Sequence, residues 1–222
     1  MSDWIAIIVS FGYVFLTLGC AEGLRRAGGF SPEFTRKFVH IAVGMWSIGT
    51  VLLFENQWFA VIPPAIFVVL NYISYRRDTF KAIESDDKSN LGTVYFPIAF
   101  CLIILAFWPF PALVVAALMP LTWGDAMAAI LGKQYGQIKY HVLGCTRSVE
   151  GSVSMFLFSL VSTWLALWLL PSTTAGWDNL GIALVVALVA TLVEAVSPWG
   201  LDNLTIPASS GLVLYLLVVL RA

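Results

Sequence analysis

Long apolar runs separated by short polar segments make up most of the chain. Backbone groups in hydrocarbon must be hydrogen-bonded within their own segment, and about 20 helical residues cross a core roughly 30 Å thick. The pattern therefore predicts about eight transmembrane helices, some of them near the lower limit of length. Pro63-Pro64 and Pro97 are expected to kink their helices or to mark first turns. The runs are Trp4–Cys20, Phe38–Phe54, Trp58–Tyr75, Thr93–Trp108, Pro111–Leu131, Ser152–Leu170, Asn179–Val196 and Leu204–Leu220.

The composition supports the same class of protein. Hydrophobic residues make up 59% of the chain and charged residues 11%, with a mean hydropathy of +0.88, whereas soluble domains carry about 25% charged residues. We therefore predict an all-α integral membrane protein. No linker or charge block divides residues 1–222, so we expect a single domain. We expect neither a signal peptide nor a transit peptide at the N-terminus, and the net charge of −1 gives no indication of nucleic-acid binding.

The cysteines do not suggest a metal site. Cys20, Cys101 and Cys145 are scattered along the chain without metal-ligand spacing, so we expect them to be packing residues.

The basic residues predict the orientation, because short cytoplasmic loops retain Lys and Arg. Eleven of the twelve fall in the first, third and fifth loops, and only Arg221 falls on the other side. We expect these loops to be cytoplasmic, both termini to lie outside, and the membrane to be that of a bacterial or archaeal cell. The eleven are Arg25, Arg26, Arg36, Lys37, Arg76, Arg77, Lys81, Lys88, Lys133, Lys139 and Arg147.

An acidic residue interrupts the fifth run. Asp125 lies in Trp-Gly-Asp-Ala, and an expected short loop, Gly132-Lys-Gln-Tyr-Gly136, follows that run. An ionisable side chain within a span costs several kcal/mol and usually binds or moves something charged. Further along, Arg147-Ser-Val-Glu-Gly-Ser152 opens the sixth run. Together these segments combine an acid for a divalent ion, glycines for close approach to phosphate and cations to neutralise charge, which favours a phosphate ligand.

Parts of this region also have simpler explanations. Ser148 with Glu150 is typical of a helix cap, and the Gly132-x-x-x-Gly136 spacing is often a helix-packing motif.

Three further clusters adjoin the predicted cytoplasmic loops. Arg36 and His40 share a helix face with Lys37 close by. The alternatives are a membrane anchor for Lys37 and a packing role for His40. Gly92 ends a charged segment, Ser85–Gly92, that is more typical of a solvated loop, and Tyr95 follows it. Glu194, Asp202 and Asn203 surround a turn that contains no Lys or Arg. The two acids would therefore need a metal ion or the cations of another loop. The simpler alternative is that Asp202-Asn203 only caps a helix.

The motifs and their order resemble those of the polyprenol kinase family, which includes phytol kinase, dolichol kinase and the CTP-dependent diacylglycerol kinase of yeast. The resemblance covers nearly the whole chain, and the short length is most similar to the phytol kinase branch. Many members have Lys where this chain has Arg147. The matching segments are Arg36-Lys37-x-x-His40, Gly124-Asp125-x-x-Ala128, Gly132-x-x-x-Gly136, Arg147-Ser148-x-Glu150-Gly151-Ser152 and Asp202-Asn203-x-x-x-Pro207.

The resemblance implies transfer of a nucleotide γ-phosphate, typically from CTP, to the hydroxyl of a lipid alcohol such as phytol or geranylgeraniol. Such a reaction needs positioning and charge neutralisation, with Mg²⁺ bridging the phosphates. Asp125 is then expected to be the chief Mg²⁺ ligand, assisted by Glu150 or Asp202. His40 and Asp202 are alternative bases for the alcohol proton.

The other matching residues are expected to surround the two substrates. We expect Gly92, Tyr95 and Glu194 on the alcohol side, and the following residues to bind the nucleotide: Arg36, Lys37, Gly132, Lys133, Gly136, Arg147, Ser148, Glu150, Gly151, Ser152 and Asn203.

Two other functions remain open from the sequence. CDP-diacylglycerol synthases share the central motif more loosely, and in such a cytidylyltransferase phosphatidate attacks the α-phosphate of CTP. In a small transporter, Asp125 and Glu194 would be intramembrane ion sites. Neither the alcohol nor the oligomeric state follows from the residues.

Overall fold

Each predicted apolar run is mostly helical, although the first helix continues to Ala27, the second begins at Pro32, and the third run contains two helices. The computed structural model describes residues 1–77, 90–170 and 177–221. Pro63 and Pro64 lie in the first turn of a helix, as predicted, whereas Pro97 lies inside one. The helices are α1 (Asp3–Ala27), α2 (Pro32–Leu53), α3 (Gln57–Ala60), α4 (Ile62–Arg77), α5 (Gly92–Phe107), α6 (Pro111–Met119), α7 (Ala126–Tyr135), α8 (Val149–Leu169), α9 (Trp177–Val196) and α10 (Asp202–Leu217), with a π-helical turn η1 (Pro120–Asp125) and a 3₁₀ turn η2 (Val219–Arg221).

Within the described ranges, five helical segments are long and apolar enough to cross a membrane: Asp3–Ala27, Gln57–Arg77, Pro111–Tyr135, Val149–Leu169 and Asn179–Val196. Helices α5 and α10 have 16 residues each, and α2 carries Glu33, Arg36 and Lys37 in its first turns. The structure is thus that of a largely α-helical membrane protein, and the count of eight spans remains a prediction.

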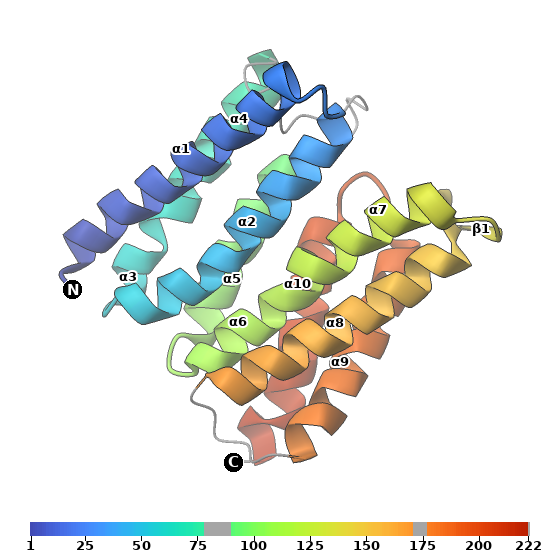
Figure 1. The fold of residues 1–222 in the computed structure, drawn as a ribbon. Coiled ribbons are helices and arrows are strands. Elements are labelled where there is room, and N and C mark those ends of the chain that lie inside the picture. Colours follow the sequence, from blue (N-terminus) through green and yellow to red (C-terminus); the bar gives the residue numbers. More distant parts are fainter. Residues whose placement is uncertain (78–89, 171–176, 222) are drawn as a thin grey trace.

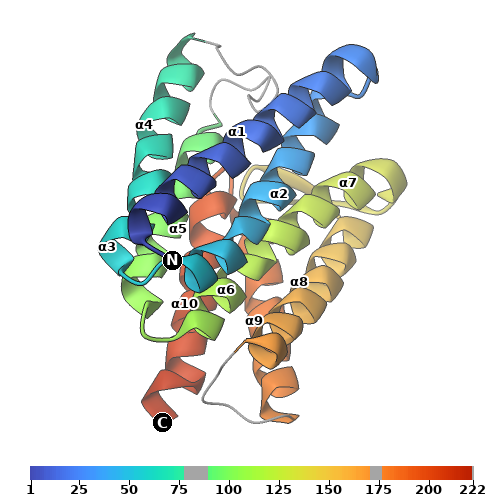
Figure 2. The ribbon, with the colours of Figure 1, turned by 60° about the vertical axis from the view of Figure 1, so that its left-hand side comes forward.

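The helices form two groups around a central one (Figure 1). Helix α1 packs on α2 and α4 packs on α5, while α8, α9 and α10 pack in sequence on the other side. The turned view shows α1 crossing in front of this arrangement (Figure 2). The central helix is the continuous segment α6–η1–α7. In its most apolar stretch of 18 residues, 78% of the residues are buried, against 22–39% in the corresponding stretches of the other four candidate spans. Both chain ends lie at the same end of the bundle, away from the turn between α1 and α2 (Figure 1).

The central helix changes its winding at η1. Pro120 begins this turn and has no N–H to donate to the preceding turn, and such wide turns are frequent at functional sites. Two glycines allow neighbouring helices to approach it closely. A Cβ added to Gly44 of α2 would lie 2.4 Å from Thr122 Oγ1, and one added to Gly124 would lie 2.2 Å from Ser159 Oγ of α8. The turn that carries Asp125 is therefore held between α2 and α8.

A short hairpin separates α7 from α8 in the otherwise helical fold. Strands β1 (Lys139–Val142) and β2 (Cys145–Ser148) pair antiparallel, with Tyr140 opposite Arg147. Leu143 and Gly144 form the two-residue turn with φ of 46° and 81°, the backbone that such tight hairpin turns require. The hairpin places Arg147 and Ser148 at the start of α8.

Candidate active site

One cavity of about 510 Å³ brings together most of the polar residues singled out from the sequence. It has two parts. We call the first part, lined by Arg36, Lys37, His40, Asp125, Arg147 and Asp202, the polar mouth. We call the second part the apolar arm; it is lined by Ser10, Val14, Val43, Trp46, Thr50, Phe54, Ala60, Pro63, Pro64, Phe67 and Phe100.

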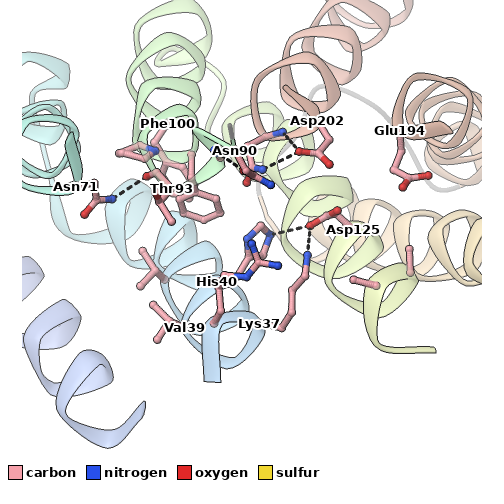
Figure 3. Close-up of a pocket in the computed structure, with 18 of the residues that line it drawn as sticks. Lys37, Val39, His40, Asn71, Asn90, Thr93, Phe100, Asp125, Glu194 and Asp202 are labelled. Atoms are coloured by element: carbon pink, nitrogen blue, oxygen red, sulfur yellow. Dashed lines mark hydrogen bonds and ion pairs between the residues drawn. The ribbon is translucent and has the colours of Figure 1, made fainter. Parts of the chain in front are cut away.

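Asp125 and Lys37 form a buried ion pair at the centre of the polar mouth (Figure 3). Lys37 Nζ donates to Asp125 Oδ2 over 2.6 Å, and the two residues are only 7% and 6% exposed. A buried carboxylate without a partner costs several kcal/mol, so the ammonium group stabilises the charge of Asp125. The alternative of a membrane anchor at the surface does not fit Lys37, because its side chain is buried and lines the cavity.

His40 lies beside this pair and is held by the central helix. Its Nε2 is 2.8 Å from the Leu121 carbonyl oxygen and 3.7 Å from Asp125 Oδ2. A carbonyl can only accept, so Nε2 carries a proton, and in the neutral ring Nδ1 is the basic nitrogen. The ring also packs on Phe96, with centroids 4.7 Å apart. Both interactions fix the ring orientation within the cavity.

Arg147 joins the hairpin to the acids of the turn between α9 and α10. Its Nε lies 2.9 Å from Glu194 Oε1, an ion pair without hydrogen-bond alignment, and Nη2 lies 3.6 Å from Asp202 Oδ2. Nη2 also donates to the carbonyls of Glu194 and Ser197. Burial alone lowers the pKa of Arg147, but the Glu194 and Asp202 carboxylates outweigh this and raise it. Arg147 thus supplies these acids with a cation from another loop, one of the two alternatives expected for them.

Asp202 and Asn203 begin α10 and do not cap it: the residue before the helix is Leu201. Asp202 Oδ1 accepts from both the backbone N–H and Nδ2 of Asn203. Across the mouth, Gly92 N donates to Asn90 Oδ1. A Cβ on Gly200 would lie 2.7 Å from the Gly92 Cα, so the α9–α10 turn rests directly on the start of α5.

The segment 132–135 is helical, which corrects the predicted loop. Residues Gly132 to Tyr135 end α7, and the glycines serve packing against α8: a Cβ on Gly132 would lie 3.2 Å from the Gly151 Cα, and one on Gly136 would lie 2.5 Å from Ser148 Oγ. Ser148 Oγ accepts from Gly151 N over 3.1 Å, so the predicted helix cap is confirmed. Gly132, Ser148 and Gly151 still line the cavity, whereas Gly136 does not.

The remaining predicted residues separate into two groups. Lys133 and Ser152 line the cavity; Lys133 pairs with Glu33, and Ser152 shares a hydrogen bond with Tyr140. Tyr95 and Glu150 do not line it. Glu150 lies in the first turn of α8. Both of its carboxylate oxygens instead accept from Ile138 N, at 3.2 and 3.4 Å, next to strand β1 of the hairpin. Glu150 is therefore not positioned as a ligand beside Asp125.

Some lining residues could not be found from the sequence. Asn71, Asn90 and Thr93 are ordinary polar residues near helix ends, yet they line the cavity, and Asn71 Nδ2 donates to the Thr93 carbonyl (Figure 3). Their adjacency depends on the pairing of α4 with α5, and no motif indicates it. The predicted solvated loop at Ser85–Gly92 lies outside the described residues except for its last three positions, and Lys81 and Lys88 lie wholly outside them.

The chain is similar to curated phytol kinases. It is 30% identical over 214 residues to the phytol kinase of the cyanobacterium Synechocystis, covering 95% of this chain and 90% of that protein. It is 29% identical to the probable phytol kinase 1 of rice, over 88% of this chain and 68% of the relative, and 24% identical to phytol kinase 1 of Arabidopsis thaliana, over 95% and 75%. No protein-family model and no solved structure matches the chain. The identity and coverage of the Synechocystis relative show that this chain belongs to the phytol kinase family and is a kinase with an alcohol acceptor, as the motifs predicted.

Proposed function

We propose that this protein transfers the γ-phosphate of CTP to the hydroxyl of an isoprenoid alcohol, such as phytol or geranylgeraniol, at the cytoplasmic face of the membrane. The observation that carries the proposal is the buried Lys37–Asp125 pair in a polar mouth that continues into an apolar arm. A lipid alcohol needs this combination, because its hydroxyl must meet charged phosphates while its tail stays in an apolar environment. The relatives' names supply the alcohol class.

The residues present fit Mg²⁺ as the metal. Asp125 and Asp202 supply oxygen ligands to the same mouth. Within the described residues no group of three His, Cys, Asp or Glu side chains forms a metal cage. Mg²⁺ is usually held by one or two carboxylates together with water and substrate phosphates, so this donor set suits it. When bound, the ion would neutralise charge on the phosphates.

The cations of the mouth would hold the triphosphate. Arg36, Lys133 and Lys139 line the same opening as Arg147. Arg147 already contacts two carboxylates and two carbonyls, so we assign it mainly to positioning Asp202. Lys37 neutralises Asp125 and lies close enough to the mouth to contact a phosphate as well.

For the alcohol proton, the structure favours His40 over Asp202. Asp202 Oδ1 accepts two N–H groups and Oδ2 faces Arg147, so both of its oxygens are already engaged. His40 Nδ1 is the basic nitrogen of a ring whose Nε2 is already engaged. A loose transition state demands only a modest base.

The test is a product assay with purified protein in detergent, Mg²⁺ and labelled CTP, with phytol, geranylgeraniol, farnesol, dolichol, diacylglycerol or phosphatidate as acceptor. We expect γ-label in phytol or geranylgeraniol. Label from the α-phosphate in the lipid would instead identify a cytidylyltransferase. The same assay with ATP, GTP and UTP tests the choice of nucleotide.

The role of Asp125 is tested by Asp125→Asn, for which we expect activity to fall by at least about a hundredfold, the scale of losing a major electrostatic contribution. Because this change also breaks a buried pair, the control is the double variant Lys37→Met/Asp125→Asn, which removes both charges. Both variants must retain the helical circular dichroism spectrum. Near-normal phosphorylation in Asp125→Asn would contradict the metal assignment.

A further inference from the structure

We infer that the apolar arm is the binding site for the tail of the alcohol, and that its closed end, at Thr50, Phe54 and Ala60, limits the length of the chain that the enzyme accepts. This inference rests on the proposed function for the identity of the head group. It adds a binding site and a selectivity that the relatives' names do not give.

The arm is continuous with the polar mouth. His40 lines the mouth, and Val43, Trp46, Thr50 and Phe54 follow at helical spacing on the same stripe of α2. One wall of the cavity therefore leads directly from the reacting end of the site down the bundle. A hydroxyl beside His40 and Asp125 would place its tail along this stripe.

The side chains of the arm are suited to a hydrocarbon. Phe54, Phe67 and Phe100 are buried aromatic residues, and Pro63 and Pro64 have no N–H to expose. The polar groups of the arm are already engaged. Ser10 Oγ donates to Ala6 O and accepts from Trp46 Nε1, and Thr50 Oγ1 donates to Trp46 O. A hydrocarbon tail in the arm would thus contact apolar side chains and would break none of these hydrogen bonds.

The length of the arm follows from helix geometry. From His40 to Phe54 there are fourteen residues, about 21 Å at 1.5 Å per residue, or roughly two-thirds of the hydrocarbon thickness of a bilayer. A carbon chain with bonds of about 1.5 Å advances about 1.3 Å per bond, so the arm accepts roughly sixteen bonds. That is the main chain of a diterpenoid alcohol such as phytol or geranylgeraniol. Farnesol would leave the far end unfilled, and a dolichol would be too long.

The residues at the far end of the arm are buried. Thr50 is 4% exposed, Phe54 6% and Ala60 1%, and Phe54 and Ala60 belong to the main hydrophobic core. Phe54 directly follows the last residue of α2 and Ala60 ends α3, so the connection between these helices forms the floor. Tightly packed floors resist expansion, and a missing or additional methylene in such a pocket changes specificity by about 10- to 200-fold.

The experiment compares kcat/KM for farnesol, geranylgeraniol and phytol in Thr50→Phe and in the wild type. A phenyl ring at position 50 fills the far part of the arm, so we expect a loss of at least about tenfold for geranylgeraniol and phytol, with farnesol changed by less than about threefold. The matched control is Val161→Phe on α8, a residue that is 52% exposed and does not line the cavity, for which the ratio should stay unchanged. Equal effects of Thr50→Phe on all three alcohols would overturn the inference.

A second measurement does not depend on turnover or on a variant. Wild-type protein is irradiated with geranylgeraniol that carries a diazirine at the end of its tail, and the attachment sites are mapped by mass spectrometry. Attachment within residues 50–60 supports the site even if no alcohol is phosphorylated, in which case only the proposed function fails. Phosphorylation with attachment mainly on the exposed faces of α8 or α9 would instead reject the tail site and leave the function standing.

Discussion

At the scale of single residues, the site depends on charges that are stable only in pairs. Lys37 and Asp125 are both almost fully buried and lie 2.6 Å apart. Removing one partner leaves the other charge uncompensated, which costs about 3–5 kcal/mol, whereas replacing both can be nearly neutral. The pair therefore has a structural role in addition to any role in phosphate transfer.

We predict that Lys37→Met and Asp125→Asn each lower the thermal unfolding midpoint in detergent, and that the double variant unfolds at a higher temperature than either single one. A double-mutant cycle then gives a coupling of a few kcal/mol. Additive losses would show that the two charges do not stabilise each other. Catalysis should not recover in the double variant, because the carboxylate is still absent.

At the scale of elements, close helix contacts set where Asp125 points. Helix α2 approaches the turn η1 at Gly44 of α2, and α8 approaches it at Gly124 of the turn. Small residues allow such close approach between helices in membranes. The direction of the Asp125 side chain thus depends on two glycines that carry no chemistry of their own.

We predict that Gly124→Ala destabilises the protein by roughly 1–3 kcal/mol, the usual cost of overpacking. Its Cβ would meet Met155 Sδ at 2.8 Å as well as Ser159 Oγ. The control is Gly12→Ala on α1, where nothing lies within 4 Å of the added Cβ and better helix propensity favours a neutral or slightly stabilising change. Thermal unfolding of both variants in the same detergent tests this, and similar midpoints would contradict the role assigned to Gly124.

At the scale of the whole molecule, the polar mouth must face one side of the membrane. Eleven of the twelve basic residues are predicted to be cytoplasmic, and both chain ends lie at the end of the bundle away from the α1–α2 turn (Figure 1). The basic distribution predicts that this turn, and with it the mouth, is cytoplasmic.

We predict that in intact bacterial cells a membrane-impermeant maleimide labels Ser2→Cys but not Arg26→Cys, each introduced after Cys20, Cys101 and Cys145 have been changed to Ser. Both positions are exposed, so both should react once the membrane is permeabilised. Labelling of Arg26→Cys from outside would reverse the orientation and place the active site on the other face.

The sequence by itself was sufficient for the positions of the helices, the family and most of the charged residues of the site. Apolar runs in a membrane must be helical because no water is available to their backbone, and buried charges such as Asp125 are too costly to be incidental. These properties are local, so they can be read from residue type and spacing alone.

Only the tertiary structure decided which residues meet. It paired Lys37 with Asp125 across 88 positions and Arg147 with Glu194 across 47, turned Glu150 toward the hairpin, and made Gly132 and Gly136 packing residues instead of a phosphate loop. It also formed the apolar arm from α1, α2, α4 and α5. The order of their residues along the chain does not indicate the length of this arm. Such features depend on how helices approach one another, and this is set by small residues and side-chain packing between segments that are distant in the chain.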